Sequence, residues 1–111
     1  MKAKLGTNSR KFRLCRWEKN SPVTQEEAEA HLNREGYPSF CWYDVPGVVY
    51  PRHWHASDEC IWILKGEAQF IIEDQSYLLK NSDRIYISAG LPHQVKVSLS
   101  TSVTYLVGRK K

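Results

Sequence analysis

Short apolar and β-branched runs, separated by turn-forming residues, fill the chain from Tyr37 onward. Glycine, asparagine, aspartate and proline gather between the runs, where strands usually end. Many short strands at this spacing are typical of an antiparallel sandwich or barrel, so the pattern predicts an all-β fold. The expected strands cover 39–45, 47–50, 60–65, 67–73, 76–79, 84–87, 94–97 and 102–107.

One helix is expected before the strands. Thr24 with Glu27 three residues later forms a capping box, in which each side chain bonds the other's backbone N–H. Ala28 and Leu32 lie four apart and share one helical face, which is a narrow apolar stripe. The pattern predicts a short helix over about 25–35 that lies on the surface of the fold.

The 111 residues have room for one core, and they divide into four segments. These are a basic arm at 1–20, the helix segment at 21–36, a barrel at 37–108 and a basic tail at 109–111. Within the arm, Phe12 to Trp17 alternate apolar and charged residues. This alternation is typical of a half-buried edge strand, which could pair with a second subunit. The alternative is that the arm, 1–20, is flexible.

Charge is distributed unevenly around the net value of +4. Residues 1–20 carry seven Lys and Arg against one Glu, and the last three residues are all basic. Subtracting these +6 and +3 from +4 leaves −5 for 21–108. Such arms can recruit nucleic acid or a protein partner, but no zinc-finger spacing or RNA-binding aromatic motif is present. We therefore expect the basic ends to be solvated or to lie on the acidic body.

No apolar run approaches the roughly 20 residues that a membrane span needs, the longest being Cys60 to Leu64. The first residues are basic but lead into no apolar stretch, so no secretory signal is expected. The three cysteines are an odd number without metal-like spacing, which favours free thiols. We expect a soluble, cytoplasmic protein.

The chemistry concentrates around two histidines and a glutamate. His53 and His55 are two apart, so on a strand both imidazoles share one face. Glu59 follows after a gap that allows a tight turn, and alternation then puts Glu59, Ile61 and Ile63 on one face. An unpaired buried carboxylate is costly, and a metal ion bound with two imidazoles removes that cost. The opposite face carries Cys60, Trp62 and Leu64.

His93 offers a fourth ligand, because it follows a Gly/Pro turn at the start of another expected strand. Three imidazoles and one carboxylate suit a first-row metal: manganese, iron, cobalt, nickel, copper or zinc. Calcium and magnesium are disfavoured because they prefer oxygen ligands only.

Residues 47–66 carry the motif G(X)5HXH(X)3E(X)6G, and on this motif the chain resembles the cupin superfamily. A second cupin motif, G(X)5PXG(X)2H(X)3N, is kept at Gly90 and His93. The resemblance covers 37–107, and the departures affect turn positions rather than ligands. They are Ser82, Ser88 and Val97.

The resemblance implies an antiparallel barrel, or jelly roll, of six to eight strands with a metal inside. By position in the motifs its ligands would be His53, His55, Glu59 and His93. It also implies a homodimer, for which Trp17, Trp62 and the alternating arm are candidate contacts.

The first functional hypothesis is a metal-dependent enzyme that acts on a small oxygen-rich molecule, by dioxygenase or by isomerase and lyase chemistry. Glu59 could act beyond ligation as a proton acceptor. The alternative is a non-catalytic module that binds a small molecule or sugar. Candidate substrate-lining residues are Tyr43, Ile61, Phe70 and Tyr86.

Overall fold

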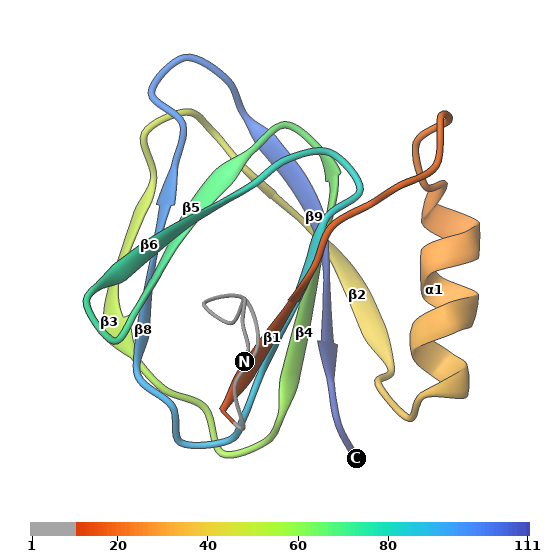
Figure 1. The fold of residues 1–111 in the computed structure, drawn as a ribbon, viewed down its shortest axis with the longest axis horizontal. Helices are drawn as coiled ribbons and strands as arrows, with labels where there is room; N and C mark the ends of the chain where they lie inside the picture. The colour runs from red at the N-terminus through yellow and green to blue at the C-terminus, as the bar shows by residue number, and fades with distance from the viewer. Residues whose placement is uncertain (1–10) are drawn as a thin grey trace.

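The computed structural model describes residues 11–111 and folds them into two antiparallel sheets and one helix (Figure 1). One sheet has the order β1-β7-β4-β9-β2, and the other has the order β3-β8-β5-β6. The strands are β1 (Phe12–Cys15), β2 (Ser39–Asp44), β3 (Val49–His53), β4 (Glu59–Lys65), β5 (Ala68–Ile72), β6 (Gln75–Leu79), β7 (Arg84–Ile87), β8 (His93–Val97) and β9 (Val103–Arg109). The predicted all-β, jelly-roll class is confirmed, and the eight expected strands are β2 to β9.

The main core lies between the facing sheets. Alternation along each strand sends every second side chain inward, as the burial of Ile61 and Ile63 in β4 shows. The larger buried side chains here are Phe12, Leu14, Phe70, Ile72, Leu79, Ile85 and Ile87.

Helix α1 (Gln25–Arg34) covers the outer face of the five-stranded sheet beside β2 and β9 (Figure 1). The predicted capping box is present, with Glu27 N–H donating to Thr24 Oγ1 over 3.1 Å and Thr24 N–H donating to Glu27 Oε1 over 3.0 Å. Ala28 and Leu32 are fully buried in a second apolar cluster. The helix therefore lies on the surface of the fold, as its narrow apolar stripe predicted.

Trp62 belongs to this second cluster and is only 2% exposed. Its indole N–H donates to the carbonyl of Ser82 over 2.8 Å, and the ring of His31 stands edge-on to it at 5.3 Å. The expectation that Trp62 offers a dimer contact is therefore wrong, because side chains of α1 cover the face of β4 that carries it.

The alternating part of the basic arm forms β1, an edge strand that pairs with β7 of the same chain. Arg16 bonds Asp83 at 3.0 Å, and Lys11 bonds Glu73 at 3.1 Å. This part of the arm thus lies on the acidic body, one of the two expected arrangements. The first half of the arm, 1–10, lies outside the described residues, so the alternative of a flexible arm stays a prediction there.

Dimerisation and nucleic-acid binding stay predictions. Among residues 11–111, no helix is long and apolar enough to cross a bilayer.

The turn before β7 explains one departure from the second motif. Ser82 stands where that motif has glycine, and its φ of +75° is a left-handed value that glycine adopts most easily. The hydroxyl of Ser82 accepts a hydrogen bond from Val23 N–H at 2.9 Å. The glycine-like turn is therefore kept, and the serine side chain ties it to the segment that precedes α1.

Candidate metal centre

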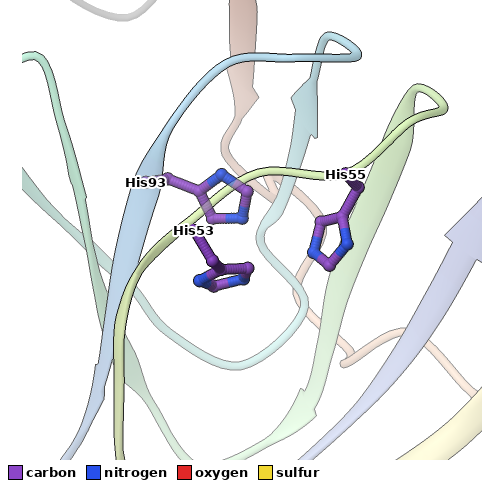
Figure 2. Close-up of side chains that lie close together, drawn as sticks. All are labelled: His53, His55 and His93. Carbon is purple, nitrogen blue, oxygen red and sulfur yellow. The ribbon is translucent and has the colours of Figure 1, made fainter.

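Three histidines converge at one end of the space between the sheets (Figure 2). His53 ends β3 and lies directly opposite His93, the first residue of β8. Their ring centroids are 4.4 Å apart, and the ring of His55 lies 4.9 Å from His53. One ring nitrogen of each residue lies within 4.8 Å of the others. The three side chains could therefore hold one metal ion.

The local chain explains this convergence only partly as predicted. Strand β3 ends at His53, so His55 reaches the centre from the loop that follows and not from the strand. The register of β3 against β8 also shifts between Tyr50 and His53. The two histidines therefore do not share one strand face, as predicted, but lie at a strand end and in a loop. Their imidazoles still converge on one point.

Two of the imidazoles are oriented by backbone carbonyls. His53 Nδ1 lies 2.7 Å from the carbonyl of Pro51, and His93 Nδ1 lies 2.9 Å from that of Leu91. A carbonyl can only accept, so each Nδ1 carries the proton and Nε2 keeps its lone pair. This is the tautomer that a metal ion needs, and carbonyl anchors of this kind are common behind metal-binding histidines.

Burial lowers the pKa of His93, and the neighbouring His53 acts in the same direction. Burial also lowers the pKa of His55, against the opposing effect of Glu59. Both imidazoles are thus held neutral to lower pH than free histidine. Neutral imidazole is the form that binds metal.

Glu59 lies beside the three histidines and is buried. Its Oε2 is 3.6 Å from His55 Nε2, and its Oε1 is 3.9 Å from His93 Nε2. Arg109 Nε bonds Glu59 Oε2 at 3.3 Å, across the register pair that joins β4 and β9. The carboxylate is therefore within reach of the centre while an arginine holds it from the other side.

Sequence reasoning missed Arg109, which was assigned to a basic tail. The residue belongs to β9 and lines the cavity. The expected last strand ended at 107, whereas β9 runs to Arg109. A prediction that continued this strand by two residues would have placed Arg109 beside the site.

A cavity of about 400 Å³ extends from the histidines between the two sheets. Ile61 and Phe70, two of the candidate substrate-lining residues, line this cavity. Tyr43 does not: it is 59% exposed, because β2 turns Phe40 and Trp42 toward the cavity and Tyr43 away from it. The full lining is Phe40, Trp42, Tyr50, Pro51, Arg52, His53, His55, Glu59, Ile61, Ile63, Ala68, Phe70, His93, Val95, Tyr105, Val107 and Arg109.

Tyr86 also lies outside the cavity, on the face of β7 that packs under α1. Its hydroxyl donates to Glu35 Oε1 over 2.6 Å, and its ring stacks edge-on with Tyr37. The expected role of Tyr86 in substrate lining is therefore wrong, since alternation in β7 assigns Ile85 and Ile87 to the main core instead.

A second polar group, also missed, surrounds the buried carboxylate of Asp44 at the end of β2. Asp44 Oδ2 accepts from the hydroxyl of Tyr105 at 2.6 Å. Asp44 Oδ1 accepts from the hydroxyl of Tyr50 at 2.7 Å and from the indole N–H of Trp42 at 3.1 Å. The three donors line the same cavity as the histidines.

The fold and this centre define a jelly-roll protein whose inner face presents a three-histidine group able to hold a metal. The model of the cupin domain family matches residues 42–107, and the chain belongs to this family. Among curated proteins, none matches the chain in sequence.

Several solved structures share the fold. The DMSP lyase DddQ from Ruegeria pomeroyi is 27% identical with a TM-score of 0.62, over 68% of this chain and 39% of that one. The chain thus spans about two fifths of that protein. The polyketide cyclase RemF from Streptomyces resistomycificus is 19% identical with a TM-score of 0.60, over 68% of this chain and 55% of that one. A cupin protein from Bacteroides fragilis is 19% identical with a TM-score of 0.59, over 86% of this chain and 80% of that one.

The donor set fits a metal ion. Three imidazoles, two of them with Nδ1 on a backbone carbonyl, match the preference of divalent first-row metals, and a buried carboxylate lies within 4 Å of two imidazoles. A cavity of this volume beside the centre has the size of a small-molecule site.

Proposed function

We propose that this cupin is a metal-dependent enzyme that acts on a small oxygen-rich molecule held in the cavity. The observation that carries the proposal is the convergence of His53, His55 and His93 beside Glu59 at one end of that cavity. A bound divalent metal would act as a Lewis acid toward an oxygen of the substrate. Glu59, held by Arg109, is placed to hold a proton at Oε1 or Oε2 next to the reacting atoms.

The wall chemistry supports a small substrate that places an oxygen at the histidine end of the cavity. Beyond the histidines the lining is mainly aliphatic and aromatic, with Ile61, Ile63 and Phe70 on facing strands. Apolar walls exclude water and strengthen the few polar contacts made inside. The likeness to solved enzymes such as the DMSP lyase supports catalysis as the role, without assigning its reaction to this chain.

Elemental analysis of the purified chain, with His53→Ala beside it, tests the metal. We expect about one first-row metal per chain, with affinity lowered at least about 100-fold in the variant. His31→Ala is the matched control, since His31 belongs to α1, packs edge-on against Trp62 and lies outside the cavity. A chain that takes up no metal after reloading contradicts the proposal.

Turnover assays distinguish an enzyme from a binding module. Iron, nickel or copper would direct the search to oxygen consumption, and manganese or zinc to isomerase and lyase reactions. Metal-dependent conversion within a panel of sugars, uronates and diketones is the expected result. Ligands that raise the melting temperature without any conversion would favour the non-catalytic module instead.

A further inference from the structure

Trp42, Tyr50 and Tyr105, which line the cavity and bond the buried Asp44 behind them, form its second polar end, called the Asp44 end. Tyr105 and Arg109 are four residues apart in β9, so their Cα atoms are separated by about 13 Å along the strand. Arg109 lies with Glu59 at the histidine end, and Tyr105 bonds Asp44 at the other end. A ligand that touches both ends would therefore be several atoms long.

Among the described residues, no cationic side chain pairs with Asp44. Asp44 is 6% exposed, and its hydrogen-bond donors are two phenols and one indole, all neutral. Within residues 11–111, no Lys, Arg or His nitrogen lies within 4 Å of its carboxylate. Two arginines line the cavity: Arg109 bonds Glu59, and Arg52 forms no ion pair with Asp44. A buried carboxylate stabilised only by neutral donors attracts a cation.

Asp44 also fixes what the two tyrosines offer to the cavity. Tyr50 and Tyr105 each direct the hydroxyl proton to the carboxylate, so their oxygens face other groups only as acceptors. Burial and the Asp44 hydrogen bond raise the pKa of both phenols, which keeps these protons in place. This end of the cavity therefore accepts hydrogen bonds and donates none through these tyrosines.

Aromatic faces complete this end and leave it open to solvent. Phe40 and Trp42 line the cavity with their rings 6.1 Å apart, and they remain 46% and 47% exposed. Aromatic faces attract cations, and more strongly where water is partly excluded. Acceptor oxygens, a net negative charge and aromatic walls favour the same kind of group.

We propose that the Asp44 end of the cavity binds an ammonium group of the ligand, while an oxygen of the ligand lies at the histidine end. The substrate class is then a small molecule with a protonated amine at one end and a carboxylate or hydroxyl at the other. The part that concerns the histidines rests on the proposed function. The ammonium site itself needs no metal, so it can be tested separately.

The test uses the metal-free full chain and three probes of equal length: n-butylammonium, 1-butanol and butyrate. Each is titrated while the indole N–H resonance of Trp42 is followed by NMR, the resonance being assigned with Trp42→Phe. We expect n-butylammonium to shift this resonance with a dissociation constant about tenfold below that of butyrate, with 1-butanol between them. Equal constants, a preference for butyrate, or no shift with any probe would overturn the proposal.

Variants locate the preference. Asp44→Asn should reduce the advantage of n-butylammonium over butyrate to about threefold or less, because the charge is removed and the amide can donate to a tyrosine. Tyr50→Phe is a second variant in case Asp44→Asn does not fold. It keeps the aromatic ring but removes one acceptor oxygen, so the advantage of n-butylammonium over butyrate should fall in this variant too. Tyr43→Phe, on the outer face of the same strand, should change nothing. An advantage unchanged in Tyr50→Phe and in a folded Asp44→Asn would overturn the site.

Failure of the two proposals gives different results. If the chain binds no metal but prefers n-butylammonium, the proposed function is contradicted and the ammonium site is supported. If the chain binds metal but shows no preference for n-butylammonium, the proposed function stands and the ammonium site is contradicted.

Discussion

Side chains of strand β4 alternate between its two faces, and these faces border two regions of different role. On one face, Glu59 and Ile61 line a cavity of about 400 Å³, where the carboxylate has Arg109 and two imidazoles around it. On the other face, Cys60 and Trp62 are sealed under α1. Burial raises the pKa of the Cys60 thiol, which keeps it protonated and inert. One face of the strand thus supplies chemistry, and the other supplies mainly stability.

Truncating the helix-covered face tests this division with the largest effect. Trp62→Ala removes a side chain that is 2% exposed, together with its hydrogen bond to Ser82. We expect the free energy of unfolding to fall by about 3–5 kcal/mol, measured by urea denaturation. The metal content of the folded fraction should not change, because no histidine of the centre contacts this face.

Trp54→Ala is the matched control for that measurement. Trp54 lies between two histidines in the sequence but is 63% exposed, so its loss should cost no more than about 0.5 kcal/mol. A similar loss of stability in both variants would contradict the division between the two faces.

The cavity face also contributes to stability where its polar groups are paired. Tyr105→Phe removes the donor to Asp44 Oδ2 and leaves that oxygen buried without a partner. We expect a loss of about 1–3 kcal/mol by the same denaturation assay. Tyr43→Phe should be neutral, since Tyr43 is exposed. An unchanged stability in Tyr105→Phe would mean that water replaces the phenol without cost.

The division along β4 could be predicted from the sequence because alternation has a period of two and Glu59 fixes its phase. The three histidines could be found from motif spacing, although His55 comes from a loop rather than from the strand. These predictions succeeded where they depended on local spacing.

The other end of the cavity could not be predicted, because its residues meet only through register. Tyr50 is three residues before His53, so simple alternation puts it on the opposite face, and the irregular register of β3 places it in the cavity instead. Asp44 joins Tyr105 through the pairing of β2 with β9, across 61 positions of sequence. The faces of Tyr43 and Tyr86 were misjudged for the same reason, since a shift of one residue inverts a strand's faces.

The smallest expected effect is a pH dependence that belongs to the cavity face alone. The pKa values of His55 and His93 are lowered in the folded chain from the ordinary value of 6.5, first of all by burial. As the pH falls below 6.5, these two imidazoles take up protons in the unfolded chain but not in the folded chain. The free energy of unfolding should therefore decrease as the pH decreases. In the metal-free chain, the melting temperature should therefore drop between pH 7.5 and pH 5, a window chosen to bracket the ordinary histidine pKa of about 6.5. His93→Gln should reduce this slope, since the buried imidazole is replaced by a group that does not titrate. A melting temperature that rises toward pH 5 would show that the cavity stabilises charged imidazoles. A slope untouched by His93→Gln would show that groups other than His93 cause the dependence, which would contradict its assignment to the cavity face.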